Sequence, residues 1–287
     1  MMNKTQKTAS EKKKPNTSCS VVVCVYEKDD AEHFELAVES LYKQTLLPSE
    51  VIVVGDGKLS RALYEKIEAL KKKHHSLKYF ELEENRGIGA ASNFGISKCK
   101  NELVAKMDSD DISVPNRIEK QVAAFEKDKE LSILGGQLEE FANNNPKEVV
   151  SRREVPTDFE DIKKFARRRS PLNNPTIMFR KKDIEAVGGY PEMSRAEDYY
   201  LFVKLIAANK KLGNLPDVLV KYRLDADNIK RRKSWKNTKE MIKARREAYK
   251  LGVARWSDYM YMKCAFIALF VMPSSLAEKL YQKRLRK

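Results

Sequence analysis

Short apolar runs rich in β-branched residues alternate with longer amphipathic stretches through the first half of the chain. The short runs suit buried strands, and the longer stretches carry apolar residues at helical spacing, as Leu63, Ile67 and Leu70 do. This alternation is typical of βαβ units, so it predicts a parallel sheet covered by helices. The predicted strands cover residues 19–26, 51–54, 77–82 and 102–107, and the predicted helices cover 31–45, 59–74 and 88–98.

The second half of the chain has a less regular pattern. It predicts helices over 115–125, 159–167 and 196–208, strands over 131–135, 176–180 and 218–223, and a mobile polar hairpin near 143–146. Beyond residue 233 the pattern is helical to the last residue. We therefore expect an α/β domain that is followed by a C-terminal helical extension.

Three segments follow from this pattern. Residues 1–18 carry charges but no apolar stretch, which predicts a disordered basic tail. Residues 19–225 form the predicted α/β domain, and residues 226–287 form a basic, helical extension. The longest apolar run, 264–272, has nine residues. A helix needs about twenty to span a bilayer, so we expect no membrane-spanning segment.

Positive charge is concentrated in the extension. The chain has a formal net charge of +15, from 56 Lys and Arg against 41 Asp and Glu. Residues 221–287 hold 19 of these cations and 6 of the anions, a net +13, which leaves +2 for residues 1–220. Basic clusters beside the aromatic stretch 256–272 suit docking on an anionic membrane. The alternative is a helix that packs on the core with a solvated basic face.

The cysteine pattern argues against a zinc site. The four cysteines share no CxxC or CxxH spacing, and none of the three histidines lies beside one of them. We therefore expect reduced thiols in the core of a cytoplasmic protein.

Acidic residues follow two of the predicted strands. Asp56 comes after the second strand, and the segment Asp108-Ser109-Asp110-Asp111 comes after the fourth. Ligands of open α/β sheets bind outside the carboxyl ends of the strands, so Asp56 and Asp108 should face one crevice. Three neighbouring carboxylates repel one another unless a cation offsets them, and hard oxygen ligands suit Mg²⁺ or Mn²⁺. A turn or helix cap with exposed aspartates is the alternative on spacing alone.

A second acidic pair, Glu197-Asp198, begins the predicted helix over 196–208. Either carboxylate could stabilise the first turn of that helix, because anions are favourable there. The other use of such a carboxylate is as a general base that removes a proton from a hydroxyl group. The sequence leaves both uses open.

Five ordered motifs together resemble the nucleotide-sugar domain of the family 2 glycosyltransferases, which have the GT-A fold. The resemblance covers about residues 19–222 and implies a mixed central sheet flanked by helices. It also implies an enzyme, a hexosyltransferase that takes its sugar from a UDP-sugar. The motifs are SVVVCVYEKD, VIVVGDG, ENRGIGAASNFGI, LVAKMDSDD and AEDYYLFVKL.

The resemblance implies a nucleotide site at the first strands. Tyr26 would stack on the uracil, Asp56 would accept a hydrogen bond from its imide, and Arg86 of the Asn-Arg-Gly turn would lie near the nucleotide. One departure concerns the second motif, where family members usually have two adjacent acids and this chain has Gly55 before Asp56.

The resemblance also implies a metal site and a base. Asp108 and Asp110 match the metal-binding Asp-x-Asp, with Asp108 nearer the ribose and Asp110 on Mg²⁺ or Mn²⁺. Asp198 matches the catalytic base of the family's Glu-Asp motif, and Glu197 would support it. A single displacement by the acceptor hydroxyl inverts the configuration at the anomeric carbon.

Relatives with similar basic tails build capsule, O-antigen or exopolysaccharide repeats on polyprenyl-diphosphate lipids. The resemblance therefore implies a carbohydrate acceptor that is linked to such a lipid, and peripheral attachment to the inner face of the cytoplasmic membrane. Arg231 and Arg232 are candidates for contact with the lipid diphosphate, because guanidinium groups suit bidentate contacts with phosphate.

Two other classes of protein have some support in the sequence. The basic extension is compatible with nucleic-acid binding, but the acidic strand ends would repel a phosphate backbone. The segment Gly87-Ile88-Gly89-Ala90-Ala91-Ser92 is similar to the dinucleotide fingerprint of an NAD-binding dehydrogenase. It has Ser92 in place of the last glycine or alanine, however, and it follows the third strand instead of the first.

Overall fold

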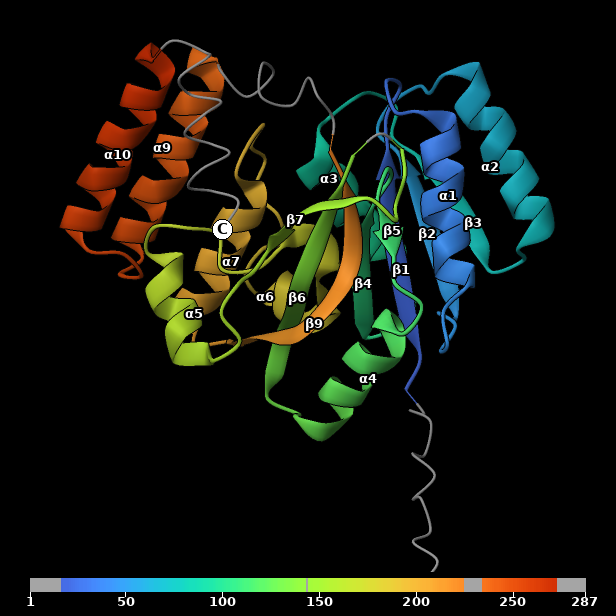
Figure 1. Cartoon of the computed structure of the whole chain (residues 1–287), viewed down its shortest axis with the longest axis horizontal. Coiled ribbons are helices and arrows are strands. Elements are labelled where there is room, and N and C mark those ends of the chain that lie inside the picture. The colour runs from blue at the N-terminus through green and yellow to red at the C-terminus, as the bar shows by residue number, and fades with distance from the viewer. Residues whose placement is uncertain (1–16, 143, 225–233, 273–287) are drawn as a thin grey trace, which may run out of the picture.

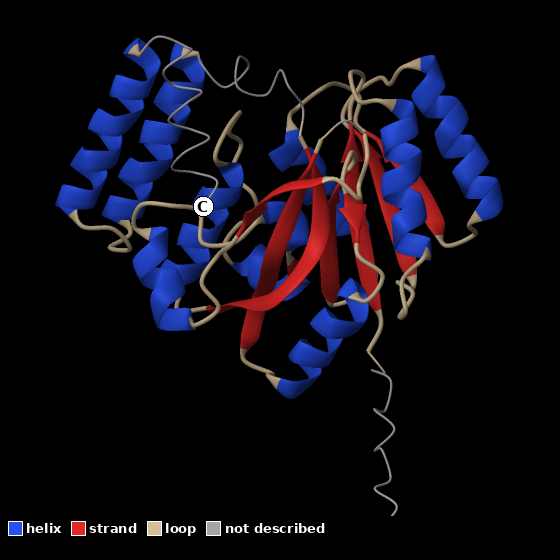
Figure 2. Ribbon diagram, in the orientation of Figure 1, coloured by secondary structure: helices blue, strands red, loops and turns tan. Residues whose placement is uncertain are grey.

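The computed structural model describes residues 17–142, 144–224 and 234–272. Within them, nine strands form one sheet that lies between helices (Figures 1 and 2). The first half contains β1 (Cys19–Val25), α1 (Ala31–Tyr42), β2 (Glu50–Gly55), α2 (Arg61–Lys73), β3 (Leu77–Glu81), α3 (Ile88–Lys98), β4 (Leu103–Asp108), β5 (Ile112–Ser113) and α4 (Arg117–Lys127). The second half contains β6 (Leu131–Phe141), β7 (Val149–Arg153), α5 (Phe159–Ala166), the 3₁₀ turn η1 (Asn174–Thr176), β8 (Met178–Arg180), α6 (Lys181–Ala186), α7 (Glu197–Ala207), β9 (Lys211–Arg223), α9 (Trp235–Lys250) and α10 (Trp256–Val271).

The strand order is β3-β2-β1-β4-β8-β6-β9-β5, and β7 pairs with β6. The first four strands are parallel, as their sequence pattern predicts, whereas β8 runs antiparallel to both β4 and β6. The sheet is therefore mixed, and the fold class expected from the motifs is confirmed. Strand β9 begins well before the predicted residue 218. The apolar pattern does not predict the first part of β9, because Gly213 and Pro216 interrupt it. They lie near a shift in the β6–β9 register.

Alternate residues of the central strands face two separate cores. In β1, Val21 and Val23 pack with α1, α2 and α4, while Val22 and Cys24 pack with α3 and α7 on the other face. Both faces are buried, so the strand reads as a continuous apolar run. This rigid sheet holds the carboxyl ends of β1, β2 and β4 beside one another.

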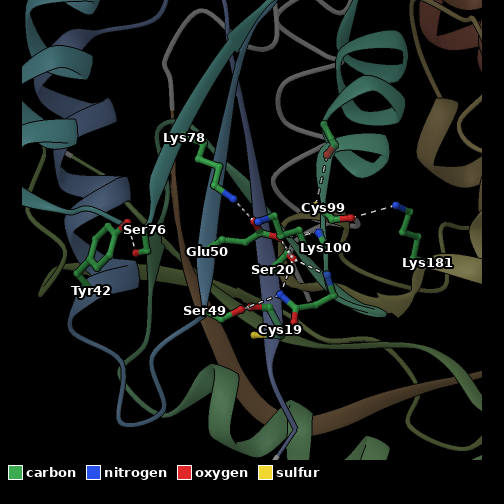
Figure 3. A network of polar contacts seen from close by, with 12 residues as sticks. Cys19, Ser20, Tyr42, Ser49, Glu50, Ser76, Lys78, Cys99, Lys100 and Lys181 are labelled. Atoms are coloured by element: carbon green, nitrogen blue, oxygen red, sulfur yellow. Dashed lines mark hydrogen bonds and ion pairs between the residues drawn. The ribbon is translucent and has the colours of Figure 1, made fainter.

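A polar network closes the opposite end of the sheet (Figure 3). The carboxylate of Glu50, at the start of β2, accepts hydrogen bonds from Ser20 Oγ at 2.7 Å, Lys78 Nζ at 2.6 Å and the backbone N–H of Lys100 at 2.6 Å. Glu50 is buried, and these donors offset the cost of removing its charge from water. The network therefore has a structural role at the end of the sheet away from the strand carboxyl ends.

The C-terminal helices lie side by side next to α5 and α7 (Figure 1). Ala244 and Ala248 of α9 pack against Tyr199 and Val203 of α7. In α10, the buried carboxylate of Asp258 accepts hydrogen bonds from the Nε atoms of two arginines that follow α5, each at 2.7 Å. Of the two alternatives for this extension, packing on the core is thus realised for α9 and for the start of α10.

Cys19, Cys24 and Cys99 are buried as predicted, but Cys264 is exposed on α10, so the expectation of a core thiol is wrong there. No helix among the described residues is both long enough and apolar enough to span a bilayer. The predicted basic tail lies outside the described residues up to residue 16, and so do Arg231 and Arg232.

The Asp258 contacts predict how firmly α10 is attached. Asp258→Ala removes the shared acceptor of Arg167 and Arg168, and it should cost roughly 1–3 kcal/mol, limited by the partial exposure of both arginines. We expect faster proteolysis within α10, measured by mass spectrometry of the fragments. Asp161→Ala, at an exposed aspartate of α5, is the matched control. Equal protection of α10 in both variants would contradict this attachment.

Candidate active site

A cleft of about 750 Å³ opens at the carboxyl ends of β1, β2 and β4. Five of the sequence-predicted site residues line it, namely Tyr26, Asp56, Asp108, Asp110 and Glu197. Other lining side chains include Lys28, Asp29, His33, Asn85, Lys106, Asn144, Asn174, Tyr222 and Arg223. The cleft thus brings together residues from both halves of the chain, from Cys24 to Leu224.

The floor of the cleft near β2 is fixed by Asp56. Its two carboxylate oxygens accept hydrogen bonds from the backbone N–H groups of Arg86, at 2.8 Å, and Gly87, at 2.9 Å. Gly87 has φ of 87°, a conformation that favours glycine at this turn into α3. Asp56 therefore joins the end of β2 to the Asn-Arg-Gly turn.

Arg86 contributes to this floor through its backbone. Its side chain is about half exposed, and Nη2 forms an ion pair with Glu192 Oε1 at 2.9 Å. The predicted contact of Arg86 with a nucleotide stays a prediction. In a dinucleotide fingerprint, the N–H groups of such a turn would face a pyrophosphate. Here two of them are already used by Asp56.

The loop after β4 carries the clustered aspartates. Asp108 forms an ion pair with the Nζ of Lys106, a buried side chain of β4. Asp111 is also buried, and its Oδ1 accepts a hydrogen bond from the backbone N–H of Arg223 at 2.9 Å. Arg223 Nε in turn donates to the carbonyl oxygen of Asp110 at 2.9 Å. Asp111 is thus structural, while Asp108 and Asp110 are the acids of this loop that line the cleft.

These two carboxylates fit a divalent cation. Burial, together with the negative charges of Asp108 and Asp29, raises the pKa of Asp110 to about 6, so its ionised form is unfavourable without a nearby cation. Among the described residues, no group of three or more His, Cys, Asp or Glu side chains is placed to hold a metal ion. Two oxygen ligands completed by diphosphate and water are what Mg²⁺ sites commonly use.

The loop after β1, which contains Tyr26, is hydrogen-bonded to the loop after β4, which contains the clustered aspartates and is called the aspartate loop below. Asp29 Oδ2 accepts hydrogen bonds from Ser109 Oγ at 2.7 Å and from the backbone N–H of Tyr26 at 3.2 Å. Burial raises the pKa of Asp29 to about 6. The position of Tyr26 is therefore coupled to the loop that contains Asp108 and Asp110.

The acidic pair lies at the first turn of α7. The residue before the helix, Ala196, has φ of 62° and makes no capping hydrogen bond through its side chain, so neither acid occupies the N-cap position. Asp198 Oδ1 accepts a hydrogen bond from the N–H of Tyr199 at 2.6 Å. Burial, and to a smaller extent the charge of Asp198, raises the pKa of Glu197 to about 7. Burial also raises the pKa of Asp198. Strongly shifted carboxylates beside a cleft are typical of proton-transfer sites.

Sequence reasoning missed the cations of this site. Lys106 interrupts the apolar strand β4 two positions before Asp108, and a lysine at a buried strand position signals an acidic partner. Arg223 lies at the end of β9, where its charge is stabilised by a hydrogen bond to Asn144 Oδ1 at 2.7 Å. The sequence carries no comparable signal for Arg223, because its partners are distant along the chain.

Of the acidic pair, Glu197 lines the cleft and Asp198, the next residue of α7, is not among the lining residues. A mixed sheet with this strand order, an Asp-x-Asp loop at the end of a central strand and an acidic pair at the first turn of a helix beside the same cleft define the class of protein. They are the features of a GT-A transferase, which binds a nucleotide-diphospho-sugar at the carboxyl ends of the parallel strands.

Comparison with known proteins identifies the family. The model of glycosyl transferase family 2 matches residues 20–188, more than half of the chain. The chain belongs to this family, and it is a glycosyltransferase.

Two curated relatives align over almost their whole lengths. One is the UDP-Gal:alpha-D-GlcNAc-diphosphoundecaprenol beta-1,3-galactosyltransferase of Escherichia coli, 34% identical over 93% of this chain and 96% of its own. The other is the amylovoran biosynthesis glycosyltransferase AmsE of Erwinia amylovora, 33% identical over 92% of this chain and 98% of its own. Family membership removes the NAD-binding dehydrogenase as an explanation of this cleft.

A solved structure is similar in fold. The mannosyltransferase PcManGT of Pyrobaculum calidifontis, in complex with GDP-Man and Mn²⁺, aligns with a TM-score of 0.62 and 16% identity. The alignment covers 94% of this chain and 83% of the mannosyltransferase. At this identity the similarity concerns the fold.

Proposed function

We propose that this glycosyltransferase moves a hexose, with inversion, from a UDP-sugar to a sugar that is linked to a polyprenyl diphosphate, in the synthesis of a surface polysaccharide. The observation that carries the proposal is one cleft lined by Tyr26, Asp56, Asp108, Asp110 and Glu197. The name of the E. coli relative, which specifies a UDP-sugar donor and a lipid-diphosphate acceptor, supports the choice of substrates.

On the donor side, each residue has a distinct role in the proposal. Tyr26 stacks on the uracil, and Asp56, already oriented by two backbone N–H groups, accepts the imide N–H with a remaining lone pair. Asp108 binds the ribose and, with Asp110, holds Mg²⁺ or Mn²⁺ through hard oxygen ligands. The bound cation would offset the negative charge that grows on the departing diphosphate.

On the acceptor side, Asp198 takes the proton of the attacking hydroxyl. The hydroxyl oxygen forms a bond to the anomeric carbon as the bond to the UDP oxygen breaks, and the electron pair leaves with UDP. Glu197 lines the cleft and supports Asp198 by holding a proton, since burial and the charge of Asp198 raise the pKa of Glu197 to about 7. A neutral Glu197 leaves the ionised form to Asp198. Because attack occurs opposite to the departing UDP, an α-linked donor gives a β-linked product.

The proposal is tested by a transfer assay. The protein is incubated with Mn²⁺, a panel of UDP-hexoses and a synthetic acceptor with a sugar on a short polyprenyl diphosphate. We expect one UDP-hexose to give a disaccharide product, whose anomeric proton coupling in NMR reports a β linkage. An α-linked product would contradict inversion, and an absence of product with every UDP-hexose would contradict the donor assignment.

We also propose that α10 places the enzyme on the inner face of the cytoplasmic membrane, beside its lipid-linked acceptor. Asp258 and Lys263 are the charged residues of this helix, and much of its apolar surface is exposed. Trp256 is 61% exposed and Val271 is 74% exposed. An apolar helix that exposes aromatic residues suits a bilayer surface, and the basic clusters of the extension suit anionic lipid.

The membrane proposal predicts the effect of two substitutions. Trp256→Ser combined with Val271→Ser should reduce binding to vesicles containing anionic phospholipid by about tenfold, because it removes two exposed apolar side chains from the helix. Co-sedimentation measures the bound fraction. Leu47→Ser, at a residue 58% exposed after α1, is the control and should leave binding unchanged. Equal binding of both proteins would contradict a role for α10.

A further inference from the structure

Arg245 of α9 is buried against the first turn of the helix that carries the catalytic pair. Its side chain is 5% exposed, and its guanidinium carbon lies 3.6 Å from the centroid of the Tyr199 ring. Tyr199 directly follows Asp198, and its hydroxyl donates to the carbonyl oxygen of Ala166 at 2.9 Å. The arginine is therefore stacked on a ring that is itself anchored at its far end.

The guanidinium of Arg245 is only partly hydrogen-bonded, with the Tyr199 side chain as its partner. Its Nε and Nη1 atoms are buried and have no hydrogen-bond partner. Burying these two nitrogens is costly, since their N–H groups leave water without replacement partners. Stacking on Tyr199 recovers part of that cost, and so does attraction to a nearby anion. The neighbouring Arg246, by contrast, is exposed.

The anion that interacts with Arg245 is Asp198. Burial raises the pKa of Asp198, and the positive charge of Arg245 acts against that rise, while the carboxylate in turn favours the charged form of the arginine. Lys106, from β4, also acts to lower the pKa of Asp198. Asp108 acts in the opposite direction, and Glu197 is coupled to the same carboxylate through its own charge. The charge of Asp198 is thus favoured by cations from two different elements, β4 and α9.

We propose that the C-terminal extension completes the active site through Arg245, a positioning residue that holds the first turn of α7, and with it the carboxylate of Asp198, in place. The family model ends at residue 188, so this contribution comes from a part of the chain beyond it. The inference rests on the proposed role of Asp198 as the base. The positioning role of Arg245 makes α9 a part of the catalytic unit, in addition to any role of the extension in membrane attachment.

The test compares two adjacent arginines of α9 in detergent micelles without anionic lipid. Arg245→Met should lower kcat about tenfold with the KM for the UDP-sugar within about twofold, because the donor site is unchanged. Without the cation, the carboxylate pair binds a proton more readily. The acid limb of the kcat profile should therefore move to higher pH, on the order of one unit. Arg246→Met removes the same charge from an exposed position and should behave as the wild type.

A second variant separates charge from stacking. Arg245→Lys keeps the positive charge but loses the planar group, so it should retain the acid limb of the wild type and still lower kcat. It also provides the pH comparison if Arg245→Met does not fold, which is checked by circular dichroism. An acid limb that moves with Arg245→Lys, or stays in place with Arg245→Met, would overturn the inference.

Failure of the inference about Arg245 can be distinguished from failure of the proposed function. If the wild type gives no transfer from any UDP-sugar, the proposed function fails. If the wild type is active and Arg245→Met matches Arg246→Met in kcat and in pH profile, only the inference fails. In the Asp198→Asn background, Arg245→Met should cost less than threefold in kcat, since a residue that acts through Asp198 has little left to act on.

Discussion

Asp198→Asn should lower kcat for sugar transfer by about a hundredfold or more while leaving the affinity for UDP within about threefold. The amide has nearly the same shape as the carboxylate and can still accept the hydrogen bond from the N–H of Tyr199, so the first turn of α7 should be preserved. It cannot take a proton from the acceptor hydroxyl. The change therefore removes the base and keeps the donor site.

The measurement is a pair of experiments on the same preparation. Initial rates with saturating UDP-sugar and acceptor give kcat, and calorimetry with UDP and Mn²⁺ gives the affinity. Asp161→Asn, at an exposed aspartate of α5, is the control and should match the wild type in both. Near-normal turnover by Asp198→Asn would exclude Asp198 as the base, and Glu197→Gln would then be the variant to examine.

Removal of the metal should have an effect of similar size. Asp110→Asn is expected to reduce transfer by at least a hundredfold, because a neutral amide is a poorer ligand for a divalent cation than a carboxylate. Chelation of the wild type should have the same effect, reversed by added Mn²⁺. Added Mn²⁺ should not restore Asp110→Asn.

Asp110→Asn should lower activity but should not lower the stability of the metal-free protein. Asp110 lies among Asp108 and Asp29, whose charges disfavour its ionised form. In the absence of metal, Asp110→Asn removes one of these like charges, so its melting temperature should equal or exceed that of the wild type. A clear fall in melting temperature would mean that Asp110 is a structural acid, as Asp111 is. Full activity after chelation would contradict a metal-dependent mechanism.

The parts of the site that are local in sequence could be predicted from it. The apolar runs that become β1, β2 and β4 are each followed by a polar turn, and parallel pairing brings these turns together. Tyr26, Asp56 and Asp108 are therefore found in one cleft as expected. The family resemblance supplied the roles that spacing leaves open, such as that of Asp198.

The parts that depend on long-range packing could not be predicted. The contacts of Arg223 with the aspartate loop join residues more than a hundred positions apart, and no local pattern encodes them. The stacking of Arg245 on Tyr199 likewise depends on how α9 packs on α7. Basic residues near the C-terminus indicated a charged surface, and the structure shows one of them buried at the core instead.

The metal-dependent UDP-sugar site is tested most directly by nucleotide binding to the purified protein, measured by calorimetry. We predict that UDP binds in the presence of Mn²⁺, that chelation abolishes binding, and that GDP, dTDP and NAD bind at least tenfold more weakly. At about a hundredfold excess over the dissociation constant, UDP with Mn²⁺ should also stabilise the protein by roughly 2.7 kcal/mol. Binding of UDP that is indifferent to chelation, or equal binding of all four nucleotides, would contradict a metal-dependent UDP-sugar site in this cleft.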